Sequence, residues 1–250
     1  MILLIDIGNS NIVFAFSNME KINKSFRFKT LSDKTSDEYY IMIKSMLDLY
    51  KFDDVIISSV VPVVTSCLKK LFKSYYNIDS KIVGPGVKTG IQLKVDDPKT
   101  VGADIICDCS GAMIYSKEAI IVDLGTATKY IYVKNSTFYG VSIAPGVSIS
   151  MKALINNAAL LPNIEFSQPK KVIATNTISC MQSGVIYGSA SQVDGMIDRI
   201  KEEINNKDIP VYATGGLSGV IVPLCKNQIA IKENLTLEGL LDIYKKNLVA

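Results

Sequence analysis

The sequence predicts an α/β protein that contains two copies of one domain. Apolar runs typical of strands open the chain, and helical patterns follow them. The segment D-I-G-N-S-N at residues 6–11 is matched by D-L-G-T-A-T at residues 123–128, and each copy stands between two apolar strands. We therefore expect two tandem α/β domains, residues 1–115 and 116–250, joined near residues 112–118.

The first copy reads as a strand meander followed by helices. A polar turn at residues 7–10 separates its first two strands. The capping box T-S-D-E at residues 35–38 predicts the start of a helix, because Thr35 and Glu38 can each satisfy a backbone N–H of the first turn. Pro62 favours the start of a second helix. The predicted strands are 2–6, 11–17, 24–30 and 54–59, and a further helix follows Asp104 to about residue 115.

The second copy repeats the pattern from residue 119. Its long helix is expected at about 179–205, because six apolar residues recur there on one helical face. A later strand, P-V-Y-A-T-G-G, breaks at Gly215 and Gly216. The predicted strands are 119–123, 130–134, 138–143 and the start of 210–216, and the residues of the helical face are Ile186, Ala190, Val193, Ile197, Ile200 and Ile204.

Composition excludes several classes of function. The chain has 250 residues and a net charge of +3, and it has no block of Lys and Arg. These features argue against nucleic acid or a membrane as partner. The five cysteines form no C-x-x-C pair and are odd in number, and no signal peptide is visible. We expect free thiols and a cytoplasmic protein.

The chain contains no histidine. Ser-His-Asp and Cys-His machinery are excluded, and so are zinc sites built on histidine. A general base would then be Asp or Glu before Lys, Tyr or Cys. A metal ion would be a hard cation held by oxygen ligands.

A single Asp-x-Gly turn has a plain structural interpretation, in which Gly supplies an unusual backbone angle and Asp caps the turn. Two copies in the same setting favour phosphate binding. Small residues let backbone N–H groups approach a phosphate, and a carboxylate can hold a hydrated divalent ion beside it. T-G-G-L-S at 214–218 is a third element of this kind, so the three fit a nucleotide in a cleft between two related domains.

Ten segments in order make the chain resemble the type III pantothenate kinases of the acetate and sugar kinase/Hsp70/actin superfamily. The resemblance covers nearly the whole chain. It implies two tandem ribonuclease H-like (actin-like ATPase) domains with a nucleotide cleft between them. The segments are D-I-G-N-S-N (6–11), I-S-S-V-V-P (57–62), G-P-G-V-K-T-G-I (84–91), D-P-K-T-V-G-A-D (97–104), V-D-L-G-T-A-T (122–128), I-A-P-G-V-S-I-S (143–150), A-A-L-L-P (158–162), T-N-T-I-S-C-M-Q-S-G-V-I-Y-G (175–188), A-T-G-G-L (213–217) and L-T-L-E-G-L (235–240).

The resemblance implies that ATP phosphorylates pantothenate, the first step of coenzyme A synthesis. Asp6 matches the position that faces Mg²⁺, and Asp123 matches the position that binds a monovalent cation, K⁺ or NH₄⁺. The implied ATP-binding residues are Asp6, Ile7, Gly8, Asn9, Ser10, Asn11, Ile12, Val13 and Thr126.

The resemblance also assigns the acceptor side. Asp104 matches the catalytic base that takes the proton from the pantothenate hydroxyl, and its alternative role is a charge that favours a helix N-terminus. Family members are homodimers with sites at the interface, and Thr177 matches a pantothenate contact that reaches across it. The implied substrate-binding residues are Val95, Gly102, Ala103, Asp104, Ile105 and Thr177.

Several positions depart from the family pattern. Ile105 stands where an Arg is usual, Val95 where an aromatic residue is usual, and Lys129 where a Thr is usual. Ile131 stands where an Asp follows the usual aromatic residue, here Tyr130, and Tyr139 stands where a Gly is usual. Three hypotheses follow: a pantothenate kinase with a remodelled acceptor pocket, a non-catalytic relative that senses nucleotide or pantothenate, and a kinase for another small acceptor. We also expect Lys129 either to replace the missing charge at a phosphate or acceptor carboxylate, or to face solvent.

Overall fold

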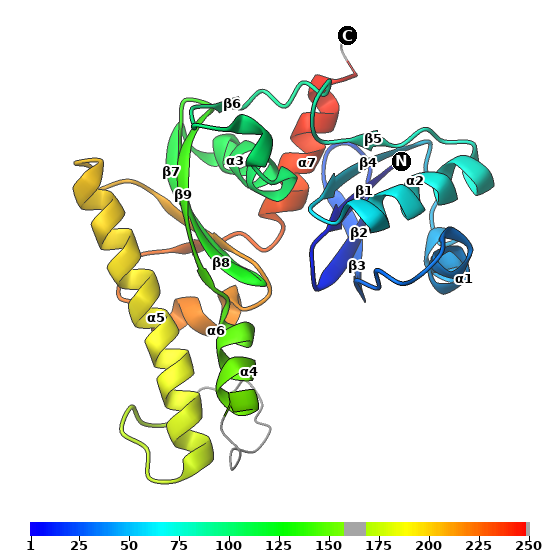
Figure 1. Ribbon diagram of the computed structural model, residues 1–250. Helices are drawn as coiled ribbons and strands as arrows, with labels where there is room; N and C mark the ends of the chain where they lie inside the picture. Colours follow the sequence, from blue (N-terminus) through cyan, green and yellow to red (C-terminus); the bar gives the residue numbers. More distant parts are fainter. Residues whose placement is uncertain (158–168, 249–250) are drawn as a thin grey trace. The chain divides into compact units, whose positions relative to one another are not determined.

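The computed structural model describes residues 1–157 and 169–248 (Figure 1). The chain divides into two compact units, and each has its own sheet. Unit 1 comprises Met1–Tyr115, Ser136–Phe138 and the chain from Asn234 onward. Unit 2 comprises Ser116–Asn135 and Tyr139–Glu233.

The sheet of unit 1 has the order β3-β2-β1-β4-β5. The meander β1, β2 and β3 is antiparallel, whereas β4 is parallel to β1 and β5 is parallel to β4. Strand β1 therefore lies at the centre, and every residue from Ile2 to Ile5 is buried because sheet or helix covers it on all sides. The strands are β1 (Ile2–Ile7), β2 (Asn11–Ser17), β3 (Ile22–Lys29), β4 (Asp54–Ser59) and β5 (Lys81–Ile82).

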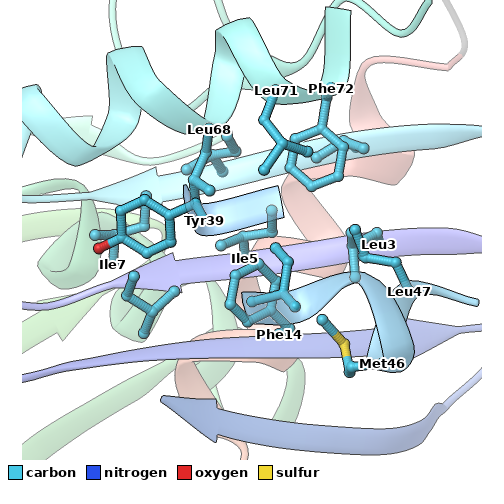
Figure 2. Packing of buried hydrophobic residues seen from close by; sticks show 14 of the residues in the cluster. Leu3, Ile5, Ile7, Phe14, Tyr39, Met46, Leu47, Leu68, Leu71 and Phe72 are labelled. Carbon is cyan, nitrogen blue, oxygen red and sulfur yellow. The ribbon is translucent and has the colours of Figure 1, made fainter. Parts of the chain in front are cut away.

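Helices α1 (Ser36–Leu47) and α2 (Pro62–Tyr76) supply the apolar layer against this sheet (Figure 2). Alternate residues of β1 face that layer, as the period of two in a strand requires. The predicted capping box is present, since Thr35 and Glu38 bond reciprocally at the start of α1. The labelled core residues in Figure 2 are Leu3, Ile5, Ile7, Phe14, Tyr39, Met46, Leu47, Leu68, Leu71 and Phe72.

The C-terminal helix α7 (Leu235–Lys246) packs against α3 (Ala103–Tyr115) inside unit 1. Glycines allow the approach: a Cβ at Gly239 would lie 1.8 Å from the Cys107 carbonyl oxygen. The Thr236 hydroxyl donates to the buried Asp108 carboxylate at 2.6 Å. Unit 1 therefore includes a C-terminal segment that the sequence placed in the second domain, because α7 buries its apolar face against α3. The domain boundary at residue 115 stays a prediction.

Unit 2 repeats the strand order of unit 1. Its strands follow the order β11-β10-β7-β8-β9, in which β7 and β8 are antiparallel and β7, β10 and β11 run parallel. The short β6 (Gln92–Leu93) pairs with the first two residues of β9, which cluster with unit 1. The strands are β7 (Glu118–Leu124), β8 (Ala127–Lys134), β9 (Thr137–Pro145), β10 (Val211–Thr214) and β11 (Ala230–Ile231).

Helix α5 (Thr177–Glu203) buries the predicted apolar face, with Ile186, Val193 and Ile197 against the core of unit 2. The sequence made no prediction for α4 (Val147–Asn157) or for α7 as a helix of unit 1. The expected joint at 112–118 is mostly helix, since α3 extends to Tyr115 and only Ser116 and Lys117 precede β7. The remaining short helices are η1 (Pro98–Thr100), α6 (Ser218–Ile221) and η2 (Val222–Leu224).

Three other sequence observations have different outcomes. All five cysteines are free thiols, as predicted. The A-A-L-L-P segment at 158–162 lies outside the described residues. Across residues 1–157 and 169–248, no helix has the length and apolar character needed to cross a bilayer.

Candidate functional site

The first turn (residues 7–10) joins β1 to β2, directly after Asp6. The Gly8 N–H donates to the Asn11 carbonyl oxygen at 2.9 Å and closes the turn. From the end of β3, the Thr30 hydroxyl donates to the Gly8 carbonyl oxygen at 2.6 Å, and the Thr30 N–H donates to the Ser10 carbonyl oxygen at 3.1 Å. The turn is thus fixed by hydrogen bonds to its backbone groups, and the side chains of Asn9 and Ser10 stay exposed.

Asp6 lies between two strands that present uncharged residues to it. Ser58, its partner on the parallel strand β4, donates its hydroxyl to Asp6 Oδ1 at 3.0 Å. Val13 is its partner on β2. The side chains of Ile7 and Ile12 are in the core, so these two predicted ATP-binding positions offer only backbone groups to a ligand.

Asp104 lies in the first turn of α3, close to the first turn of the sheet. Its Oδ1 accepts from the Ile105 N–H at 2.9 Å. A Cβ at Gly102 would lie 2.4 Å from that oxygen and 3.4 Å from Val60 Cγ1. Val60 in turn donates its N–H to the Ile7 carbonyl oxygen at 3.0 Å. The loop before α3 therefore adjoins the first turn within unit 1, and glycine at residue 102 lets the Asp104 carboxylate fold back over the loop.

Cys107 places Asp6 and Asp104 in one electrostatic neighbourhood. Its thiol is fully buried, and burial is the main cause that raises its pKa well above the usual value. The negative charge of Asp6 is the next cause, and Asp104 adds to it. Asp6 and Asp104, predicted from separate motifs, thus lie on the same side of unit 1, near one buried thiol and near Val60 at the first turn.

The other predicted acceptor residues differ in how much of each side chain is exposed. Ala103 and Ile105 are buried on the inner face of α3, and the Ile105 side chain is only 6 % exposed. Val95 is half-buried in unit 1. Thr177 is exposed at the start of α5 in unit 2, where Asn176 caps the helix by accepting from the Ser179 N–H at 3.0 Å.

The second turn (residues 125–126) joins β7 to β8 in unit 2. Asp123 on β7 and Lys129 on β8 are directly opposite each other in the antiparallel ladder. The Lys129 Nζ donates to Asp123 Oδ2 at 2.6 Å, and both side chains are 14 % exposed. The ammonium therefore neutralises the carboxylate that the family resemblance assigns to a monovalent cation.

Two glycines hold the second turn in place. A Cβ at Gly146 would lie 2.2 Å from the Thr126 carbonyl oxygen. Gly215, at φ +92°, lies against the backbone of Leu124, where a Cβ would come within 2.5 Å. The third predicted element, 214–218, thus lies beside the second turn. Sequence reasoning did not single out Gly146, although the I-A-P-G segment that contains it was part of the resemblance.

The carboxylates differ in their fitness for metal ions. Among the described residues, His, Cys, Asp and Glu form no group of three that could cage a metal. Mg²⁺ needs no such cage, because it keeps waters and binds one or two carboxylates together with substrate phosphates. Asp6 fits that use. Asp123 does not fit a bound monovalent cation, because the Lys129 ammonium already holds one of its oxygens at hydrogen-bond distance.

The Asp123–Lys129 pair was not predicted, although the sequence contained its signal. A tight turn between two strands places residues in register, and Asp123 and Lys129 are each three residues from Thr126, about which the ladder is symmetric. The sequence left Lys129 either at a phosphate or acceptor carboxylate or facing solvent. The structure instead shows its ammonium on Asp123, with little of the side chain exposed.

Residues 2–199 match the family described as type III pantothenate kinase. A type III pantothenate kinase of Acholeplasma laidlawii is 44% identical over 248 residues, which cover 99% of this chain and 100% of the relative. One from Halalkalibacterium halodurans is 43% identical over 254 residues, again with 99% and 100% coverage. The similarity therefore extends over both units.

Solved structures with low identity share the fold. A conserved protein of Campylobacter jejuni, assigned to the Baf family of transcriptional activators, superposes with a TM-score of 0.60 at 20% identity, covering 99% of this chain and 100% of the other. A protein of Sinorhizobium meliloti assigned as a 2-dehydro-3-deoxygalactonokinase gives 0.59 at 8% identity, covering 99% of both. These likenesses confirm the predicted fold class of two ribonuclease H-like units.

Proposed function

Because this chain belongs to the type III pantothenate kinase family, we propose that it transfers the terminal phosphate of ATP to pantothenate in the first step of coenzyme A synthesis. The observation that carries this proposal is identity of 44% along the full length of a named relative. The two repeated turns, each held in shape by its own unit, agree with it.

We assign the ATP phosphates to the backbone of residues 6–13 in unit 1 and to Thr126 in unit 2. The exposed side chains of Asn9 and Ser10 add donors beside the first turn. Asp6 would hold Mg²⁺, which, when bound, neutralises phosphate charge during transfer. Asp6 Oδ1 accepts from the Ser58 hydroxyl, which orients the carboxylate at the end of β1.

Asp104 is proposed to accept the proton of the pantothenate hydroxyl. A primary alcohol is a weak nucleophile, and a carboxylate within hydrogen-bond reach can remove its proton as the phosphoryl group arrives. Asp104 is partly exposed and stands beside the first turn, where the phosphates are assigned. Gly102, Ala103 and Val95 would line the acceptor with backbone and apolar groups.

A second candidate function rests on Ile105. The usual Arg would grip an acceptor carboxylate, whereas Ile105 is apolar and buried against the core. A non-catalytic relative that binds nucleotide or pantothenate, or a kinase for another small acceptor, would account for that loss. Turnover with a panel of acceptors separates the three possibilities.

The test is phosphorylation of pantothenate by the purified protein with ATP and Mg²⁺. Asp104→Asn should keep the fold and ATP binding but lose roughly 10²–10⁴ in rate, the usual contribution of a general base. Asp97→Asn is a matched control, because Asp97 caps the nearby η1 and Asn caps equally well. Normal turnover by Asp104→Asn would remove the base assignment, and an inert wild type with every acceptor would favour the sensor.

We also propose a cytoplasmic homodimer, in which Thr177 of one copy serves the site of the other. Helices α4 and α5 present exposed apolar side chains at Ile149 and Ile178, and Gly184 and Gly188 have open space around them. Close helix packing of a second copy would cover this face. Light scattering after gel filtration should give twice the chain mass, and Ile178→Asp should shift it toward the monomer.

A further inference from the structure

We propose that the Lys129 ammonium takes the place of the monovalent cation at Asp123, so that the kinase activity proposed above requires neither K⁺ nor NH₄⁺. The proposal rests on the proposed function for its catalytic consequence only. The ion pair between Lys129 and Asp123 is present in the structure whatever the activity of the protein.

The geometry places an ammonium group where an ammonium ion would bind. Lys129 Nζ lies 2.6 Å from Asp123 Oδ2, at a carboxylate that ends the strand before the second turn. A lysine head group carries the same charge as NH₄⁺ and offers three N–H donors. It can therefore supply the charge that K⁺ or NH₄⁺ would bring to this turn and the hydrogen bonds that NH₄⁺ would donate.

The covalent attachment of the Lys129 ammonium to β8 favours it over a cation from solution. Strands β7 and β8 hold the two residues in register, so the ammonium is always present at high local concentration. Both side chains are 14 % exposed, and screening by water between them is weak. A second monovalent cation at Asp123 would meet the ammonium at close range, and like charges in such a site repel strongly.

The same strand pair contains a natural comparison. At its other end, Lys134 faces Glu118 in register, with Nζ 3.3 Å from Oε1 and side chains 45 % and 21 % exposed. The distance between the charged atoms is longer in this pair than in Asp123–Lys129, and its side chains are more exposed to water. The pair also lies at the end of the strands away from the turn. It shows what an ordinary cross-strand ion pair of this sheet looks like, and Lys134→Met is therefore the matched control.

The activity arm of the test compares KCl, NH₄Cl and tetramethylammonium chloride at equal ionic strength. Wild type and Lys134→Met should turn over equally in all three salts. Lys129→Met should be at least about tenfold slower in tetramethylammonium chloride and should be restored by K⁺ or NH₄⁺, because one charge-assisted hydrogen bond is replaced by a bound ion. Lys129→Gln repeats the arm with a polar substitute in case Lys129→Met folds poorly.

A second arm needs no turnover. The unfolding temperature of the protein without nucleotide is measured in the same three salts. K⁺ and NH₄⁺ should raise it, relative to tetramethylammonium, in Lys129→Met and Lys129→Gln and not in wild type. Strong activation or stabilisation of wild type by K⁺ overturns the proposal. Lys129 variants that work equally in every salt, or that neither K⁺ nor NH₄⁺ restores, also overturn it. If wild type is inert in every salt, the proposed function fails and this second arm alone decides the inference.

Discussion

The two repeated turns follow equivalent strands with the same Asp-x-Gly pattern, yet their aspartates face different partners. At the end of β1, Asp6 is opposite Val13 and accepts from the neutral Ser58 hydroxyl. At the end of β7, Asp123 is opposite Lys129 and pairs with its ammonium at 2.6 Å. The residue in register with each aspartate on the next strand is therefore apolar in unit 1 and cationic in unit 2.

The turns are also held by different means. The first is fixed by hydrogen bonds from Thr30 to the carbonyl oxygens of Gly8 and Ser10. The second is fixed by the close approach of Gly146 and Gly215 to its backbone. A duplicated unit can therefore keep its fold and turn sequence while the residues around the turn are exchanged, and the chemistry of each copy follows those residues.

The largest effect is expected at the glycine contact of the second turn. Gly146→Ala places a Cβ 2.2 Å from the Thr126 carbonyl oxygen, which belongs to backbone and cannot swing away. We expect the free energy of unfolding to fall by about 3 kcal/mol, as for a tightly overpacked site. Urea denaturation measures it. Gly195→Ala on α5, where a Cβ meets open space, is the control and should not destabilise the protein. Equal stability of the two variants would mean that the second turn is not held in this way.

Removing the ammonium of the second turn should have a smaller effect on stability. Lys129→Met leaves the Asp123 carboxylate without this partner in a site that is 14 % exposed, which should cost about 2 kcal/mol. Lys134→Met should cost less than about 1 kcal/mol, because the pair it breaks is more exposed. Thermal and urea unfolding at low salt compare the two. A larger loss for Lys134→Met would contradict the difference we draw between the ion pairs.

The smallest effect is expected from giving Asp6 the cross-strand partner that Asp123 has. Val13→Lys places an ammonium opposite Asp6, where it competes with Mg²⁺ for the carboxylate. We expect ATP·Mg²⁺ to bind about tenfold more weakly, the lower end for one charge-assisted contact. Val13→Met keeps the length without the charge and serves as control. Titration calorimetry at several Mg²⁺ concentrations should show that excess metal recovers the affinity, and no change in Val13→Lys would place the metal away from Asp6.

Local patterns predicted much of the fold. The Thr35 capping box, Pro62 at the start of α2 and the apolar face of α5 are each present, because each depends on residues close in the sequence. The docking of α7 on α3 was not predictable, since it depends on glycines at 111 and 239 meeting backbone more than a hundred residues away. Helix α4 was missed because its short apolar pattern follows a strand and Pro145 without a clear cap.

The sequence predicted some site residues and missed the partner of another, because motifs are local whereas partners come from the fold. Asp6, Asp104 and Asp123 stood out by motif, and the structure brings the first two together in unit 1. The partner of Asp123 came from register across the turn, which motif matching does not consider. Ile105→Arg would restore the arginine that is usual at this position. Because Ile105 is buried, that substitution must first place a guanidinium in the core, and we expect it to destabilise α3.

The central claim is that the two aspartates have separate tasks, Asp6 with Mg²⁺ and Asp123 with Lys129. Its most direct test is the Mg²⁺ dependence of ATP binding, measured by calorimetry in Asp6→Asn and Asp123→Asn beside wild type. We predict that Asp6→Asn binds ATP at least about tenfold more weakly and gains almost nothing from added Mg²⁺, because the charged metal contact is lost. Asp123→Asn should keep the wild-type response to Mg²⁺. The reverse pattern, or an equal loss of the Mg²⁺ response in both variants, would contradict the account.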